Sequence, residues 1–360
     1  MLKGKDYTWQ QSNLSIVGTD LERNVKKASA ETEQAWQGAG KDVGQQIWRI
    51  EKFKVVPWNQ DNYGSFYSGD SYIILNTYRE GEELKHNLHF WIGRHSTRDE
   101  YATAAYKAVE LDTFLNDKPI QYREVHGNES ELFKGYFREM QIWSGGIDSG
   151  FRHVEPKTYQ TRLMHFEGTR NNIVVKEIDL LKSNVSTNDV YILDQGLTIY
   201  LWSGSNSNKD ERLKASQFVT QLKNQRGKAQ SEFLDEAHTP QTHPFWQALP
   251  EGEPKQVSES DSKTFVPVLL RLSDASGGLE MTKIAEGQRF ERSRLDSNDV
   301  FILDDGTQIF VWIGREASSG ESSKAIEYGH NYAKETKHPF VPILRIVEGQ
   351  HVGSFESRFS

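Results

Sequence analysis

Residues 67–78 read YSGDSYIILNTY, in which a Gly-Asp-Ser triplet leads into the apolar run Tyr72–Leu75. Two later stretches have the same form, NDVYIL at 188–193 and NDVFIL at 298–303. A short apolar run that follows turn-forming residues is typical of a buried β-strand. We therefore expect a strand directly after the aspartate in each of three copies.

A second apolar run, which ends in Trp and Gly, follows each of these strands. The runs are LHFWIG, IYLWSG and IFVWIG, and their tryptophans Trp91, Trp202 and Trp312 are almost evenly spaced. A charged segment with helical periodicity comes next in each copy. An interval as long as a typical domain predicts three tandem domains, each a sheet with a long helix on one face, rather than a solenoid of short repeats.

The link between the two strands differs in the first copy. The interval from Asp189 to Trp202 equals that from Asp299 to Trp312, whereas the interval from Asp70 to Trp91 is longer. The turns DQG and DDG of the later copies are typical of tight hairpins. The additional residues of the first copy lie in NTYREGEELKHN, at 76–87, which predicts a longer polar hairpin loop there.

The remaining strands and the linkers follow from the segments between these motifs. An earlier apolar run is expected to form one more strand in each copy, at residues 45–56, 161–168 and 266–274. A strand after the helix then completes a β-β-β-α-β unit or a close variant. Linkers are predicted at 152–158, which reads RHVEPKT, and more plainly at 250–263, which is rich in Pro, Glu and Ser.

The composition excludes several classes of protein. The 360-residue chain has no cysteine, which excludes a disulfide framework and thiolate metal sites. A net charge of −8 with both signs well mixed argues against a general nucleic-acid binder. The N-terminus lacks the apolar segment of a signal peptide, and no apolar run approaches the roughly 18 residues needed to span a bilayer. We expect a soluble intracellular protein.

Two glycine-containing stretches do not fit the enzymatic motifs that they partly match. Ser71 precedes a strand, whereas a serine nucleophile elbow lies between a strand and a helix, and the matching positions in the other copies are Val190 and Val300. GAGKDVG at 38–44 lacks both a preceding strand and the Gly-Lys-Ser/Thr ending of a phosphate loop. We expect a protein that is not an enzyme and has no catalytic residues.

A pair of acidic residues recurs in all three copies. The pairs are Asp70 with Glu100, Asp189 with Glu211, and Asp299 with Glu321, and each glutamate follows the tryptophan of its copy at the same interval. A Thr, Asn or Ser one turn before each glutamate makes a helix capping box, and aspartate is an ordinary turn residue before a strand. The joint recurrence instead favours a hard cation such as Ca²⁺, which prefers carboxylate and carbonyl oxygens. Both interpretations stay open from the pattern alone.

Together these motifs resemble the gelsolin/villin superfamily. The segments QIWRIEKFKVVP, YGSFYSGDSYIIL and DEYATAAYKAVELDTFL are similar to the first domain of the family, GLTIYLWSGSNSNKDERLKASQ to the second and SNDVFILDDGTQIFVWIG to the third. The resemblance implies an α+β fold of three tandem gelsolin-like domains, each a mixed central β-sheet flanked by a long and a short helix. The expected boundaries are an N-terminal extension at 1–40 and domains at 41–155, 156–252 and 253–360.

Three repeats without a second triplet or a headpiece are typical of the severin/fragmin-type branch. This resemblance implies a calcium-dependent protein of the cytoplasm and the actin cytoskeleton that binds monomeric and filamentous actin, severs filaments, caps their barbed ends and also nucleates. Domain 1 would bind the monomer and the barbed end, and domain 2 the side of the filament. A monomer is expected when actin is absent. The alternative is a calcium-independent capping or monomer-binding protein that does not sever.

The resemblance also implies calcium ligands. In domain 1 the intradomain site would use Gly69, Asp70, Glu100 and Ile147, with Gly69 and Ile147 contributing carbonyls. A second site there would use Asp112 with carbonyls near Asp117 and Pro119, and an actin carboxylate would complete it. Asp117 and Pro119 stand where the family often has small residues, which leaves the shape of this loop open. The ligands implied for domain 2 are Asn188, Asp189, Glu211 and Asp261, and those for domain 3 are Asn298, Asp299 and Glu321.

Partner-binding residues follow from the same resemblance. The helix expected at 98–115 would enter an apolar cleft of actin. Its binding face would contain Tyr101, Tyr106 and Val109, and Phe151 would contact actin nearby. These side chains would instead pack on the sheet of their own domain if the helix had only a structural role. A basic segment of domain 2 would contact acidic actin or else form a solvated helix face, and it contains Lys209, Arg212, Lys214, Lys223, Arg226 and Lys228. The segments that match the phosphoinositide-binding stretches contain only Arg138, Arg162 and Arg170, which predicts weak lipid binding.

Overall fold

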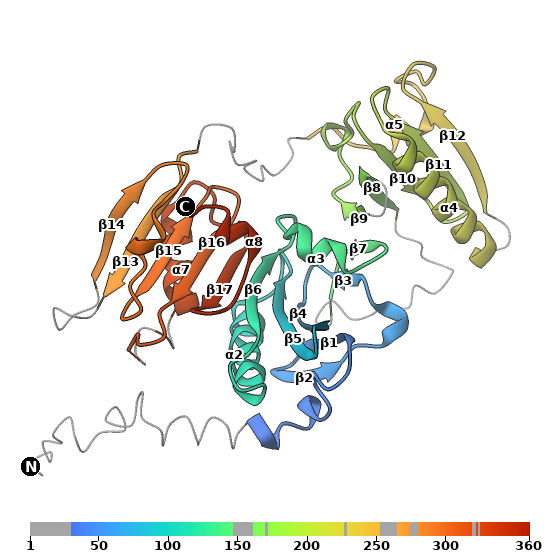
Figure 1. Ribbon diagram of the computed structural model, residues 1–360. Helices are drawn as coiled ribbons and strands as arrows, with labels where there is room; N and C mark the ends of the chain where they lie inside the picture. Colours follow the sequence, from blue (N-terminus) through green and yellow to red (C-terminus); the bar gives the residue numbers. More distant parts are fainter. Residues whose placement is uncertain are drawn as a thin grey trace, which may run out of the picture.

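Figure 1 shows the computed structural model of the chain. It describes residues 30–146, 161–169, 172–226, 229–252, 265–273, 280–318, 322 and 325–360. The linker predicted at 152–158 and most of the one predicted at 250–263 lie outside the described residues. The names domain 1, domain 2 and domain 3 are used below for the described residues within the three ranges expected from the sequence.

Domain 1 has a five-stranded sheet with the long helix α2 on one face. The sheet consists of β1 (Gly44–Glu51), β2 (Lys54–Pro57), β4 (Ser71–Glu80), β5 (Glu83–Ile92) and β6 (Ile120–Val125). The other elements of the domain are η4 (Gln60–Asn62), β3 (Ser65–Tyr67), α2 (Arg98–Phe114), α3 (Glu131–Gly135) and β7 (Met140–Trp143). The predicted N-terminal extension contains η3 (Gln34–Trp36), whose Trp36 is buried in the cluster under α2. Ala104, Ala108 and Leu111 of α2 are fully buried against the sheet, which fixes the face that the helix turns inward.

Domains 2 and 3 repeat this plan. Domain 2 contains β8 (Arg162–Thr169), β9 (Asn172–Ile178), η5 (Lys182–Asn184), β10 (Val190–Asp194), β11 (Thr198–Ser203), α4 (Lys209–Arg226), β12 (Gln230–Asp235) and α5 (Pro244–Gln247). Domain 3 contains β13 (Val268–Ser273), β14 (Glu280–Glu286), η6 (Arg292–Arg294), β15 (Val300–Asp304), β16 (Ile309–Ile313), α7 (Ala325–Glu335), β17 (Ile343–Val347) and α8 (Gly353–Glu356). None of the described helices is long and apolar enough to cross a membrane.

The predicted α+β fold with mixed sheets is confirmed. In each domain the two strands directly before the long helix pair antiparallel with each other. The strand after the helix pairs parallel with the second of them, as in β5–β6, β11–β12 and β16–β17. The three repeated tryptophans are buried in the clusters that also contain an aromatic residue of the short helix. Trp91 shares its cluster with Phe133, Trp202 with Phe245, and Trp312 with Phe355. The repeat in the sequence therefore marks a repeated core between sheet and short helix.

Three details of the strand prediction were wrong. The run at 45–56, predicted as one strand, forms β1 and β2, which pair antiparallel across a turn where Lys52 and Phe53 have φ values of +48° and +66°. The residues predicted as a long hairpin loop in domain 1 extend β4 and β5 to 10 residues each, and Glu80 pairs with Glu83 across a tight turn in which Gly81 has a φ of +62°. The predicted β-β-β-α-β unit also omitted β9 and β14, which pair with the first strands of domains 2 and 3. Residues of β14 are mostly exposed, so this edge strand has little apolar signal.

Strands of domain 1 complete sheets with both of the other domains. A 10-stranded sheet runs in the order β14-β13-β15-β16-β17-β6-β5-β4-β1-β2, because β17 of domain 3 pairs antiparallel with β6. A 7-stranded sheet has the order β12-β11-β10-β8-β9-β7-β3, in which β7 and β3 of domain 1 extend the sheet of domain 2. Figure 1 shows domain 1 between the other two domains.

Candidate functional site

The first acidic pair lies where β4 and α2 both begin. Asp70 precedes β4 and is fully buried, and Glu100 in the first turn of α2 is 7% exposed. Thr97 and Glu100 form the predicted capping box, with Thr97 N donating to Glu100 Oε2 (3.1 Å). Ser71 Oγ lies 2.8 Å from Ser96 Oγ, which donates to Glu100 Oε2 (3.3 Å). The structure thus connects the strand start and the helix start through two hydroxyl groups.

The surroundings of Asp70 fit a calcium ion. A Cβ on Gly146 would lie 2.4 Å from Asp70 Oδ1, so only glycine allows the backbone to approach this carboxylate. Gly69 N donates to Gly145 O (2.7 Å), which holds the two loops together. Buried carboxylates beside backbone carbonyls are the ligands that Ca²⁺ prefers. Ile147, the fourth predicted ligand, lies outside the described residues.

The second acidic pair lies in the equivalent place in domain 2. Glu211 accepts from Gly168 N (3.2 Å) and from Asn208 N (3.1 Å), and Asn208 caps α4. Burial raises the pKa of Glu211, and the nearby negative charge of Asp189 adds to this shift. A raised pKa means that the negative charge of Glu211 is unfavourable where it lies, and a bound cation would compensate that charge. The predicted ligand Asp261 lies outside the described residues.

In domain 3 the structure describes one carboxylate of the predicted pair. Asp299 is 3% exposed, and Glu321 lies outside the described residues. Asn188 and Asn298, which precede the aspartates of domains 2 and 3, are exposed. Among the described residues no group of three or more His, Asp and Glu side chains could hold a metal ion. A cation at any of these places would therefore take ligands from the backbone as well.

Asp112, predicted as the side-chain ligand of the second site in domain 1, is buried near the end of α2. Gln121 Nε2 donates to its Oδ2 (2.6 Å), whereas Oδ1 is buried without a hydrogen-bond partner among the described residues. Burial raises the pKa of Asp112 to about 7. Asp117 has a φ of +57° and donates its N–H to the Asp112 carbonyl (2.9 Å), which curves the loop toward Pro119. A buried carboxylate oxygen without a donor fits a cation.

Side chains of domain 3 reach this second site. Arg345 of β17 places Nη1 3.5 Å from Asp112 Oδ2. Gln350 Nε2 donates to the carbonyls of Lys118 (2.9 Å) and Pro119 (3.4 Å). These partners come from opposite ends of the described chain, so no local pattern could have revealed them.

The outer face of α2 carries the predicted apolar contacts. Tyr106 is 61% exposed and Val109 is 41% exposed, so neither packs on the sheet of its own domain. Leu111, two residues after Val109, belongs instead to the buried face of the helix. Tyr101 is partly buried beside the same outer face, and Phe151 lies outside the described residues.

A cavity of about 520 Å³ separates this face from helix α7 of domain 3. Tyr101, Tyr106 and Val109 line it from domain 1, and Ile326 and His330 line it from domain 3. Ile326 also packs against the buried cluster under α2. In this arrangement domain 3 therefore stands in front of the surface that the sequence predicts to bind a partner.

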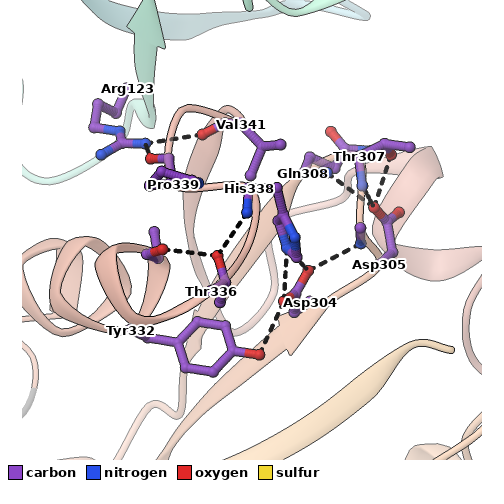
Figure 2. Close-up of polar contacts among 12 residues, drawn as sticks. Arg123, Asp304, Asp305, Thr307, Gln308, Tyr332, Thr336, His338, Pro339 and Val341 are labelled. Atoms are coloured by element: carbon purple, nitrogen blue, oxygen red, sulfur yellow. Dashed lines mark hydrogen bonds and ion pairs between the residues drawn. The ribbon is translucent and has the colours of Figure 1, made fainter. Parts of the chain in front are cut away.

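Arg123 of β6 fastens domain 1 to domain 3, as Figure 2 shows. Its Nη2 donates to the carbonyls of Pro339 and Val341, both at 2.9 Å, and its Nη1 donates to His330 Nδ1 (2.6 Å). The loop that presents these carbonyls is itself held by His338, whose Nε2 lies 3.0 Å from both carboxylate oxygens of Asp304. A single buried guanidinium on β6 thus connects domain 1 to a hydrogen-bonded loop of domain 3.

The predicted basic segment of domain 2 forms much of α4, and its side chains differ in their surroundings. Lys209 and Lys223 are exposed. Arg212 donates to the Ser207 carbonyl (2.9 Å), Arg226 Nη2 donates to Asp194 Oδ2 (2.8 Å), and Lys214 forms an ion pair with Glu139 of domain 1. Lys228 lies outside the described residues. Three of these cations therefore have structural partners within the chain.

The arginines expected to contact lipid are few. Arg138 is exposed, and Arg170 lies outside the described residues. Arg162 pairs with Asp194 (3.1 Å) and lies over the Trp143 ring, so it is already engaged at the contact between domains 1 and 2.

Ser71, which the sequence analysis considered as a nucleophile, is the first residue of β4 and is fully buried.

Three basic side chains near the aspartates were missed in the sequence. Arg49, His165 and Arg271 lie in the first strands of the three domains, and each faces the aspartate of its domain. A signal was present, because each is a basic residue between two apolar ones, in WRI, MHF and LRL. A basic residue inside a buried strand needs a partner, and this requirement could have identified all three.

Comparisons with known proteins agree with this geometry. A family model described as Gelsolin repeat matches residues 52–134, 171–239 and 281–355. Gelsolin-like protein 2 of Lumbricus terrestris is 49% identical over 97% of this chain and 96% of its own length. Severin of Echinococcus granulosus is 40% identical over 97% of this chain and 96% of its own length. Actin depolymerising venom protein gelsolin 1 of Platymeris rhadamanthus is 37% identical over 89% of this chain and 90% of its own length.

Among solved structures, the Thorarchaeota 2DGel3/rabbit actin complex matches 57% of this chain and 99% of that chain at 25% identity. Its TM-score is 0.24, so the fold assignment rests on the sequence matches and on the strand topology described above. Three matched repeats and relatives that align end to end make this chain a three-repeat member of the gelsolin family.

Proposed function

We propose that this protein binds actin, severs actin filaments and caps their barbed ends when calcium rises, and that it also nucleates filaments. The relatives that align over nearly their whole length include one named severin and one named as actin depolymerising. The observation that carries the proposal is the apolar outer face of α2, where Tyr106 and Val109 are exposed. An exposed apolar stripe on a long helix suits binding in a groove of a partner.

Calcium would be held by the acidic residues of each domain. Asp70 and Glu100 would bind it in domain 1, Asp189 and Glu211 in domain 2, and Asp299 in domain 3. The ion supplies positive charge that neutralises carboxylates which otherwise repel each other. Asp112 would take part in a second site that an actin carboxylate completes. The buried Oδ1 of Asp112 and the close approach of Gly146 to Asp70 support these assignments.

Domain 3 would act as the gate. Helix α7 faces the outer surface of α2, and Arg345 and Gln350 contact the second site of domain 1. Actin cannot bind α2 until domain 3 moves away. We call the arrangement with domain 3 over α2 the closed state, and one in which domain 3 has moved away the open state. Calcium would shift the population toward the open state by binding it more tightly than the closed state.

Domain 2 would hold the side of the filament. Lys209 and Lys223 are exposed on α4 and would attract acidic actin in a manner that salt weakens. We place the protein in the cytoplasm on the actin cytoskeleton, as a monomer when it is free of actin, with only weak binding to phosphoinositides.

Microscopy of single actin filaments with and without free calcium tests this proposal. Calcium should produce new filament ends, whereas a calcium-independent capping or monomer-binding protein would slow growth at any calcium concentration and produce none. Val109→Asp should abolish fragmentation, because a charge would enter an apolar contact. Leu132→Asp is the matched control, since Leu132 is also 41% exposed but lies on α3, away from the proposed surface. Fragmentation by the Val109→Asp variant at the wild-type rate would contradict the role of α2.

A further inference from the structure

We propose that a basic side chain of the protein itself stands at each calcium-binding aspartate in the closed state, and that calcium has to displace it. This inference rests on the calcium dependence proposed above and adds how each site is kept from filling at low calcium. The side chains are Arg49, His165 and Arg271 within the three domains, and Arg345 of domain 3 at Asp112.

The strand register places the three intradomain side chains in equivalent positions. In each domain the first strand pairs antiparallel with the strand that follows the aspartate. The pairs are Arg49 with Tyr72, His165 with Tyr191, and Arg271 with Phe301. Each partner is the second residue after the aspartate, so the basic residue and the aspartate are diagonal neighbours on one face of the sheet. The arrangement is therefore a property of the repeat and not of one domain.

The distances show that these neighbours interact. Arg49 Nη1 lies 3.5 Å from Asp70 Oδ2, His165 Nε2 lies 3.1 Å from Asp189 Oδ2, and Arg271 Nε donates to Asp299 Oδ2 at 2.8 Å. Asp70 and Arg49 are buried at 0% and 7% exposure. A buried carboxylate requires a compensating charge, and in the closed state the arginine supplies it.

Calcium and the basic side chain would share the charge of one carboxylate group, since Arg49 and Arg345 contact Oδ2 of their aspartates and leave Oδ1 to other ligands. Two cations bound to one buried aspartate repel each other strongly, because the low dielectric of the interior screens them little. A calcium ion therefore binds only if the basic side chain moves away or tolerates that repulsion. The cost of displacement lowers the calcium affinity of each site below the value that its oxygens alone would give.

Asp112, the fourth candidate ligand, also faces a basic side chain, but this one comes from another domain. Asp112 meets Arg345, which belongs to β17 of domain 3 and not to the strand beside it in domain 1. Displacing this arginine therefore also separates two domains. In this way a local exchange of cations is connected to exposure of the outer face of α2.

Calorimetric titration of the full chain with calcium tests the inference. Arg49→Met and Arg271→Met each remove the resident charge but keep most of the side-chain volume. Each should tighten calcium binding at one site by about tenfold or more, since a nearby like charge is lost. Arg358→Met is the matched control, because Arg358 pairs with Asp305 (3.0 Å), which is not a predicted ligand, and its calcium affinities should equal those of the wild type.

The outcomes separate this inference from the function on which it rests. If the wild type binds calcium and both variants keep its affinities, the resident-cation inference is wrong and the calcium-dependent function stands. If the wild type binds no calcium, both fail. Should Arg49→Met unfold, as judged by circular dichroism, Arg271→Met decides alone, since the Arg271 side chain is 43% exposed and tolerates replacement.

Discussion

Domain 1 is joined to both of its neighbours by paired strands and shared apolar side chains, yet the two junctions differ in where they place charge. At the junction with domain 3, Arg123 is buried against two backbone carbonyls and Arg345 meets the buried Asp112. At the junction with domain 2, Trp143 stacks on Phe218, and the ion pair there is partly exposed.

Because of this difference, we expect the two junctions to respond differently to calcium. Apolar contacts do not respond to a cation, whereas an arginine that shares a buried carboxylate with a candidate calcium site does. We therefore expect the junction with domain 3 to open and the junction with domain 2 to persist. Variants that disrupt one junction, and measurements of its response to calcium or pH, test this expectation.

The largest effect should come from Arg123→Met. This change removes two charge-assisted hydrogen bonds to carbonyls, each of which contributes about 1.5–3 kcal/mol. Without these hydrogen bonds between domains 1 and 3 the closed state should be less stable, so the variant should fragment filaments at calcium concentrations where the wild type does not. Filament microscopy and small-angle X-ray scattering without calcium measure the two consequences.

Arg358→Met serves as the control for this change as well, because it removes an arginine within domain 3 and leaves the junction intact. It should remain compact and dependent on calcium. If Arg123→Met is folded, compact and as calcium-dependent as the control, the junction with domain 3 is not the gate.

Trp143→Ala should show the contrasting behaviour at the junction with domain 2. The ring contacts of this partly exposed tryptophan with Phe218 and Arg162 would be lost, which should lower the free energy of unfolding by about 2 kcal/mol. The calcium concentration for half-maximal fragmentation should stay unchanged. Thermal unfolding and a calcium titration of severing measure both quantities, and a marked change in the calcium requirement would mean that this junction also acts as a switch.

A smaller effect is expected from pH. Burial, together with the charges of Arg123 and Lys334, lowers the pKa of His330 to about 4 in the closed state. In the open state its pKa should return to about 6.5. The open state therefore binds more protons below about pH 6.5, so the closed state loses stability as pH falls from there toward 4. Scattering at low calcium between pH 7.5 and 5 should detect partial opening, and His330→Gln should remove that dependence if the assignment is correct.

Much of the fold could be predicted because the deciding residues are neighbours in sequence. The equal intervals from Asp189 to Trp202 and from Asp299 to Trp312 predict tight hairpins. The capping residue Thr97 marks the residue before α2 begins. The hairpin of domain 1 was misjudged because alternating polar residues in 76–87 can extend a strand as well as form a loop.

The contacts of the candidate site could be predicted only in part. Glu100 follows Trp91 at an interval that recurs in all three copies, and the structure brings the starts of β4 and α2 together. The pairing of Asp112 with Arg345 depends on β6 meeting β17, which is a property of the assembled sheets. Side chains that join distant strands leave no periodic signal, so the contact between domains 1 and 3 became visible only in three dimensions.

The distance between α2 and α7 tests the central claim most directly. The chain has no cysteine, so Thr113→Cys of α2 and Lys334→Cys of α7, which both line the cavity, allow two spin labels to be attached specifically without changing the proposed actin contacts Tyr106 and Val109. Double electron–electron resonance without calcium should give a short, narrow distance distribution, and calcium should shift it to longer distances. The same short distribution with saturating calcium, in a protein that fragments filaments under those conditions, would contradict the account.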